Sequence, residues 1–88
     1  MLKPMSVRIL YFAALADRLG VRSEHVELPP DIASVDRLRT HLAARGGVWA
    51  DLGTFPKLRA AVNQRMAGGD APIQAGDEVA FFPPVTGG

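Results

Sequence analysis

Residues 34–42 read SVDRLRTHL and carry the clearest helix signal in the chain. Ser34 is a good N-cap, and Asp36 places a negative charge in the first turn, where the helix dipole favours it. The apolar residues recur with helical spacing and form one stripe, made of Val35, Leu38 and Leu42. Gly46-Gly47 closes the run. We therefore expect one amphipathic helix that covers a face of a sheet.

Strand patterns lie on both sides of this helix. Residues 6–12 alternate in polarity and predict a central strand, and residues 24–28 predict a more exposed strand that ends at Pro29-Pro30. A short helix over residues 13–19, ended by Gly20, is expected between them. After the main helix, residues 48–52 suggest a short turn that holds Trp49.

Three short strands are expected in the last third of the chain, over residues 58–62, 65–67 and 78–82. Asn63-Gln64 supplies a tight turn between the first two. The predicted core combines the inward-facing residues of these elements: Ile9, Tyr11, Leu38, Leu42, Val62, Val79 and Phe81. The order of elements indicates an α+β fold, a mixed sheet with one main helix across one face.

The length of 88 residues allows one domain, which we assign to residues 1–88. Residues 1–4 are interpreted as a loose N-terminal extension and residues 83–88 as an extended C-terminal tail. The formal net charge is +1 and the basic residues form no stripe, so no nucleic-acid partner is expected. No run approaches the roughly 20 apolar residues of a membrane span, and we expect a cytoplasmic protein with no membrane partner.

The absence of cysteine excludes disulfides, thiolate metal sites and a cysteine nucleophile. His25 and His41 are distant in sequence and lack a third ligand, so we expect no metal site. Neither a phosphate-binding loop nor a Ser/His/Asp arrangement is recognisable. The chain is therefore predicted to have no catalytic side chains and no bound cofactor of its own.

The last six residues are the feature that a purely structural explanation accounts for least: Pro83, Pro84, Val85, Thr86, Gly87 and Gly88. The prolines bias the exit from the sheet towards an extended path. The glycines carry no Cβ, so they suit a narrow channel in a partner and deliver only a terminal carboxylate. The alternative is an ordinary frayed tail. Phe82 is expected on the outer face of the sheet, with a second core aromatic as the alternative.

The run 76–88, GDEVAFFPPVTGG, resembles the small subunit of molybdopterin synthase, a family of ubiquitin-like sulfur carriers. Residues 9–13, the helix around 35–42 and residues 60–64 resemble the corresponding family segments in the same order. The resemblance covers residues 5–88 and implies a β-grasp fold. One departure is that Ala16 stands where the family often has an arginine, which puts any partner contact of that arginine in doubt.

The resemblance implies a function as the sulfur-donating subunit of a molybdopterin synthase complex. An adenylyltransferase similar to ubiquitin-activating enzymes would use ATP to adenylate the Gly88 carboxylate, and a sulfur donor system would then convert it to a thiocarboxylate. The large subunit, in an expected heterotetramer, would receive the tail residues 85–88 in its active site. There the thiocarboxylate would donate sulfur to cyclic pyranopterin monophosphate during molybdenum cofactor biosynthesis.

We expect Phe82, Pro83, Pro84 and Phe12 to contact the large subunit, with Val85, Thr86, Gly87 and Gly88 in its active site. The family resemblance leaves other carriers open, which feed thiazole synthesis or tRNA thiolation. A ubiquitin-like modifier that forms isopeptides with lysines shares the same activation chemistry and also stays open. An interaction domain with an inert tail is the third alternative.

Overall fold

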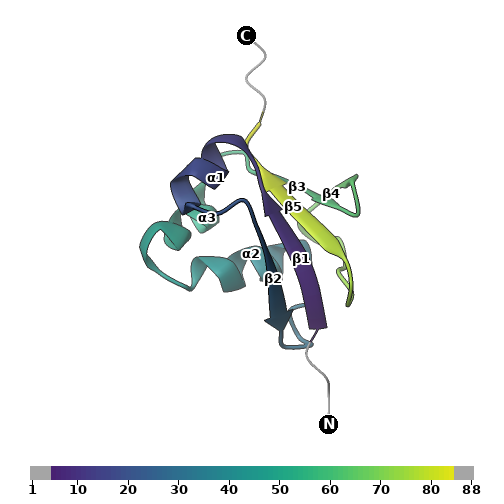
Figure 1. Ribbon diagram of the computed structural model, residues 1–88. Coiled ribbons are helices and arrows are strands. Elements are labelled where there is room, and N and C mark those ends of the chain that lie inside the picture. The colour runs from purple at the N-terminus through teal and green to yellow at the C-terminus, as the bar shows by residue number, and fades with distance from the viewer. Residues whose placement is uncertain (1–4, 85–88) are drawn as a thin grey trace.

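The computed structural model describes residues 5–84 and confirms the predicted α+β class. The predicted extension 1–4 and the tail residues 85–88 lie outside the described residues. The elements in chain order are β1 (Met5–Tyr11), α1 (Ala13–Leu19), β2 (Ser23–Leu28), α2 (Val35–Ala43), the 3-10 helix η1 (Gly47–Trp49), α3 (Ala50–Thr54), β3 (Arg59–Val62), β4 (Arg65–Ala67) and β5 (Glu78–Phe82) (Figure 1).

The strands form one mixed five-stranded sheet in the order β2-β1-β5-β3-β4. β1 pairs with β2 in antiparallel fashion and with β5 in parallel fashion. β3 is antiparallel to both β5 and β4. The strand that is last in the sequence therefore lies in the middle of the sheet, between β1 and β3.

Helix α2 begins as its sequence predicts. The Ser34 side chain accepts a hydrogen bond from the Arg37 backbone N–H at 3.2 Å, and Asp36 lies in the first turn. All three residues of its apolar stripe are buried: Val35, Leu38 and Leu42. The helix ends at Ala43, earlier than the predicted stop at Gly46-Gly47. Those glycines, with φ of 80° and 58°, instead form the turn into η1.

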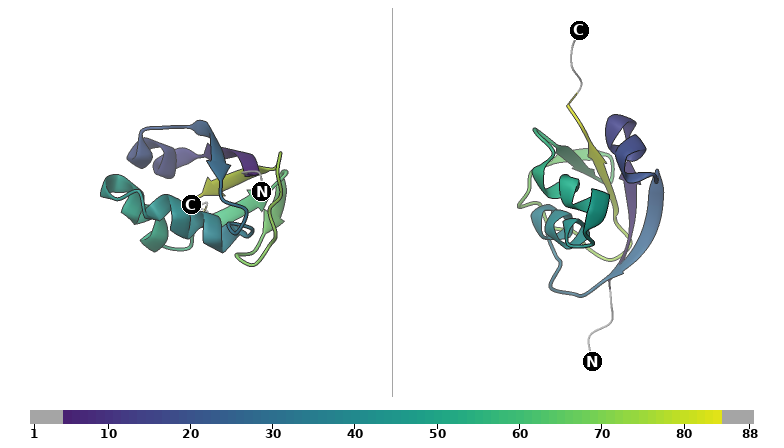
Figure 2. Two further views of the ribbon diagram at one scale, coloured as in Figure 1. Left: turned by 90° about the horizontal axis from the view of Figure 1, so that it is seen from below. Right: turned by 90° about the vertical axis from the view of Figure 1, so that its left-hand side faces the viewer.

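The core lies between the sheet and the helices, and α2 and α3 gather on one side of the sheet (Figure 2). The buried residues of the helices join the inward-facing residues of the strands in one cluster. Six of the predicted core residues are fully or almost fully buried: Ile9, Tyr11, Leu38, Leu42, Val79 and Phe81. Val62 was predicted to be buried in the core, but it is only partly buried. It lies at the end of β3 and packs against the cluster.

Residues 48–52 are helical, whereas the sequence suggested only a short turn. Residues of this segment belong to η1 and α3. Arg39 of α2 donates hydrogen bonds to the carbonyl oxygens of Leu52 at 2.7 Å and Phe55 at 3.1 Å. These bonds satisfy carbonyl groups at the end of α3 that would otherwise lack partners. A contact between segments far apart in sequence thus stabilises this helix.

Two connections use backbone with positive φ. Asn63 and Gln64, at 51° and 69°, form the predicted tight turn between β3 and β4. The Asn63 side chain also accepts a hydrogen bond from the Glu78 N–H at 3.0 Å, which ties this turn to the start of β5. Ala13 has φ of 55° at the junction of β1 and α1, which is a strained conformation for a residue with a Cβ.

Within residues 5–84, no helix is both long and apolar enough to cross a membrane.

Candidate functional site

The face of the sheet that points away from the core cluster is apolar in its half near the end of β5. The register places Leu10 of β1 beside Ala80 of β5, Ala80 beside Ala61 of β3, and Ala61 beside Met66 of β4. Phe12 and Phe82 follow by strand alternation. We call these six residues the outer face: Leu10, Phe12, Ala61, Met66, Ala80 and Phe82.

The largest side chains of the outer face are accessible. Phe12 is 47% exposed and Met66 is 62% exposed, while Leu10 and Phe82 are half-buried. Contiguous exposed apolar side chains mark interaction surfaces more often than singly scattered ones do. Ala61 and Ala80 are buried yet lie outside the core cluster, because their neighbours on the outer face cover them. The outer face is therefore an apolar surface that is accessible to a partner.

The outer face lies at the point where the chain leaves the sheet. β1 and β5 run parallel and end at the same edge (Figure 1). The Phe12 backbone N–H donates to the Phe81 carbonyl oxygen at 3.2 Å, so Phe12, which directly follows β1, lies beside the end of β5. Pro83 and Pro84 follow and are half-buried. The other predicted site residues, Val85, Thr86, Gly87 and Gly88, lie outside the described residues.

The structure brings Phe12 and Phe82 together, and it adds Leu10 and Met66, which sequence reasoning did not name as site residues. Leu10 follows from the alternation of β1, since it is on the face opposite Ile9. Met66 requires the pairing of β4 with β3, which places it beside Ala61. The predicted Asn63-Gln64 turn indicated that these strands pair, but the sequence analysis did not extend that pairing to the surface position of Met66.

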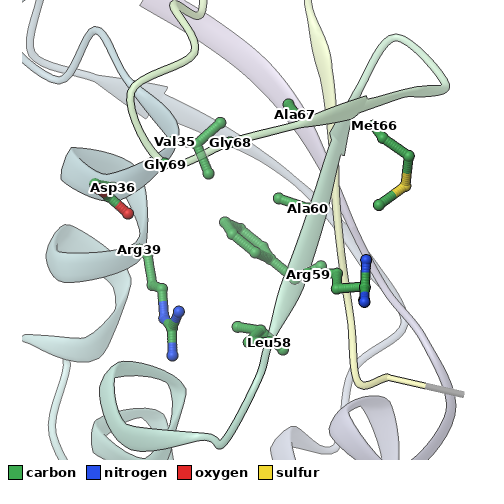
Figure 3. Close-up of a pocket in the computed structure, with 11 residues that line it drawn as sticks. Val35, Asp36, Arg39, Leu58, Arg59, Ala60, Met66, Ala67, Gly68 and Gly69 are labelled. Carbon is green, nitrogen blue, oxygen red and sulfur yellow. The ribbon is translucent and has the colours of Figure 1, made fainter.

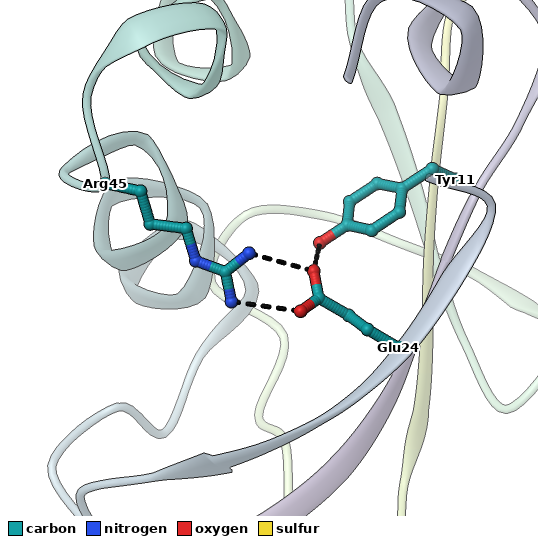
Figure 4. A network of polar contacts seen from close by, with 3 residues as sticks. All are labelled: Tyr11, Glu24 and Arg45. Carbon is teal, nitrogen blue, oxygen red and sulfur yellow. Dashed lines mark hydrogen bonds and ion pairs between the residues drawn. The ribbon is translucent and has the colours of Figure 1, made fainter. Parts of the chain in front are cut away.

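A polar network lies on the core side of the same strand ends. The Tyr11 hydroxyl donates to Glu24 Oε2 at 2.7 Å, and Arg45 donates to the two Glu24 carboxylate oxygens at 3.0 and 3.1 Å (Figure 4). The Arg45 guanidinium lies 4.3 Å from the centre of the Trp49 ring, and the Tyr11 ring stacks on Phe81 at 6.4 Å. The network joins β1, β2 and the end of α2.

Burial raises the pKa of the Tyr11 phenol well above its ordinary value, and the neighbouring Glu24 carboxylate adds to the shift. Tyr11 is therefore a neutral hydrogen-bond donor across the physiological pH range. Its hydrogen bond to Glu24 links the end of β1 to β2.

A small cavity of about 200 Å³ separates α2 from β3 and β4. The side chains of Asp36, Arg39 and Leu58 lie on the side of the strands that faces α2 (Figure 3). The side chains of Arg59 and Met66 point to the opposite side of the strands. The volume is below the roughly 300–1,000 Å³ that is usual for small-molecule sites. Among residues 5–84, no group of three or more His, Asp or Glu side chains is placed to hold a metal ion.

The Ala16 position, where an arginine is common in the resembling family, is buried against the core. Arg18, the nearest arginine in sequence, pairs with Asp51 at 2.7 Å. Arg18 therefore forms an ion pair with a residue of α3, and it does not occupy the position that an arginine at residue 16 would have.

The structure defines a class of small α+β domains with an open apolar sheet face at the root of a Pro-Pro-Val-Thr-Gly-Gly segment. The sequence matches the profile of the ThiS family over residues 9–88. The chain belongs to this family.

Similarity to individual proteins indicates which members of the family this chain resembles. The chain is 44% identical to the molybdopterin synthase sulfur carrier subunit of Escherichia coli (strain K12) over 82 residues, which cover 93% of this chain and 99% of that protein. The sequence-based resemblance to this group of carriers is confirmed.

Solved structures agree with the fold. The crystal structure of SAMP1 from Haloferax volcanii has a TM-score of 0.74 at 29% identity and covers 94% of this chain and 99% of its own. A putative molybdopterin converting factor subunit 1 from Pyrococcus furiosus has a TM-score of 0.69 at 28% identity, with 92% and 99% covered. The fold is the predicted β-grasp.

Proposed function

We propose that this chain is the sulfur-carrier subunit of a molybdopterin synthase and acts through the carboxylate of Gly88. The observation that carries the proposal is the near full-length similarity to a sulfur carrier subunit of that enzyme. The structure supports it with an apolar outer face at the root of the tail, where a large subunit would dock. Sulfur transfer itself would take place in the complex.

The chemistry that we propose begins with activation of the tail. A free carboxylate has no leaving group, so an adenylyltransferase would join the Gly88 carboxylate to AMP at the expense of ATP, with release of pyrophosphate. A sulfide-level donor, equivalent to hydrosulfide, would then attack the acyl carbon, form the new C–S bond and displace AMP. The resulting thiocarboxylate is nucleophilic at neutral pH, and it would transfer sulfur to cyclic pyranopterin monophosphate without any cysteine in this chain.

The outer face would contribute binding energy to this reaction. Ordering Val85, Thr86, Gly87 and Gly88 in a channel costs about 4–8 kcal/mol of backbone entropy. Burial of Phe12, Phe82 and Met66 against the large subunit offsets that cost, since a fully buried aromatic or aliphatic side chain contributes about 1.5–3 kcal/mol. Pro83 and Pro84 add little to this cost, because their φ angles are already fixed.

Intact-mass measurement tests the proposal. The chain is incubated with the activating enzyme, ATP and a sulfur source, and we expect the exchange of one oxygen for one sulfur at the C-terminus. Addition of the large subunit and cyclic pyranopterin monophosphate should then return the carboxylate and yield the dithiolene product. A chain that stays unmodified under conditions that convert a known carrier would refute the proposal.

A second candidate is a protein modifier, and the similarity to SAMP1, the small archaeal modifier protein 1 of Haloferax volcanii, favours it. A modifier would form an isopeptide bond between the Gly88 carbonyl and a lysine amine, again with loss of AMP. The same incubation in the presence of cell extract distinguishes the two. Covalent conjugates identify a modifier, and a thiocarboxylate that passes sulfur to the pterin identifies the carrier.

A further inference from the structure

Arg59 is a charged side chain in an otherwise apolar part of the sheet surface. The register places it directly beside Phe82, and it is exposed. Its side chain points to the same side of β3 as Met66, away from the helices (Figure 3). Arg59 therefore borders the outer face at the edge where β5 ends.

The described part of the chain supplies no acid to Arg59. The salt bridges among residues 5–84 join Arg18 to Asp51 and Arg45 to Glu24, and no side-chain hydrogen bond of Arg59 is present there. The acid on β5 that shares this side of the sheet is Glu78, four residues before Phe82, which is about 13 Å along the strand. Glu78 stands beside Arg8 in the register.

A partner that covers the outer face would remove water from Arg59. A guanidinium that is buried without a counter-ion costs several kcal/mol, so an entirely apolar partner surface would be repelled at this point. Arginine binds carboxylates with two parallel hydrogen bonds and is less strongly hydrated than lysine, which suits an ion pair at an interface. An acid on the partner is therefore the group that best compensates this cation at the interface.

We propose that Arg59 pairs with a carboxylate of the synthase large subunit and determines which large subunits this chain accepts. The inference rests on the proposed function, because it takes the large subunit as the occupant of the outer face. The large subunit would present an aspartate or glutamate within an apolar surface, opposite the end of β5. An apolar surface alone binds its partners with little selectivity. A charge that a partner leaves unpaired weakens the binding of that partner, so the charge adds selectivity.

The test measures the dissociation constant for the large subunit encoded by the same genome, by titration calorimetry, with the full chain. Arg59→Gln removes the charge and Arg59→Glu reverses it. Arg37→Glu is the matched control, because Arg37 is an exposed arginine on α2, on the other layer of the molecule. It makes the same change in net charge.

We expect Arg59→Gln to weaken binding by about 30-fold and Arg59→Glu by more, since breaking a desolvated charge pair leaves the partner's acid unpaired. Arg37→Glu should change binding by about threefold at most. The loss caused by Arg59→Glu should be partly reversed by an acid-to-lysine change on the large subunit. Circular dichroism melts of the free variants should match the wild type.

Equal effects of Arg59→Glu and Arg37→Glu would overturn the inference, as would wild-type affinity in Arg59→Gln. Weakened binding to the activating enzyme, with unchanged binding to the large subunit, would overturn the choice of occupant. A wild-type chain that does not bind the large subunit at all would instead refute the proposed function. The failures of the two proposals are therefore distinguishable.

Discussion

Phe12→Ala separates docking from folding. Phe12 is 47% exposed, and a phenylalanine side chain has on the order of 200 Å² to bury, so about 95 Å² is still available to a partner. At about 25 cal/mol per Å², that surface contributes about 2.4 kcal/mol to association. We therefore expect the substitution to raise the dissociation constant for the large subunit about 50-fold, measured by titration calorimetry.

Val48→Ala is the matched control, because Val48 is 48% exposed but belongs to η1 rather than to the outer face. It should leave the dissociation constant unchanged, and neither variant should shift the melting temperature much. Unaltered binding by Phe12→Ala, or equal losses in the two variants, would refute the assignment of the outer face as the docking surface. A Phe12→Ala protein that melts far below the wild type would show that Phe12 stabilises the fold instead.

The other predictions address the core, the tail and the polar network. Leu38→Ala should lower the free energy of unfolding by about 2–5 kcal/mol, because Leu38 is fully buried; a urea melt equal to that of the exposed-site variant Met66→Ala would contradict this. Deletion of Gly88 moves the terminal carboxylate by about 3.5 Å and should reduce sulfur delivery by about 100-fold or more at an unchanged melting temperature; full pterin dithiolene synthesis by that variant would rule out the carrier mechanism. The Tyr11 phenol has a raised pKa in the fold, so the stability that its neutral form contributes is present below about pH 10 and is lost as the pH rises towards the folded pKa. Tyr11→Phe should therefore have the shallower fall in stability between about pH 9 and about pH 11, and parallel urea-melt profiles for the two proteins would exclude this role.

Local sequence signals predicted most elements of the fold. The Ser34 cap and the apolar stripe that predict α2 lie within nine residues of sequence. The end of β2 is predicted by the two prolines that follow it directly. The helical state of α3 was not predictable in this way. It depends on hydrogen bonds from Arg39 to carbonyl groups that lie 13 and 16 residues further along the chain.

Some residues of the candidate site could likewise be predicted from the sequence, and others could not. The tail motif, Phe12 and Phe82 are recognisable from the sequence because they lie beside prolines, glycines or strand ends. Met66 and Arg59 join the surface only through the register of β3 with its two neighbours. The register of β3 with β4 is set by the local Asn63-Gln64 turn, but that of β3 with β5 arises from pairing between distant segments, so the sequence alone does not place Arg59 beside Phe82.

The position of β5 also determines how the molecule folds. β5 is the strand that joins the β1-β2 pair to the β3-β4 pair, and these two antiparallel pairs share no other strand contact. Isolated hairpins are marginally stable in water. Pairing of β1 with β5 closes a loop of nearly the whole chain, and such non-local contacts slow folding because loop closure costs entropy before they form. A chain that lacks residues 78–82 therefore lacks the strand that joins the two halves of the sheet.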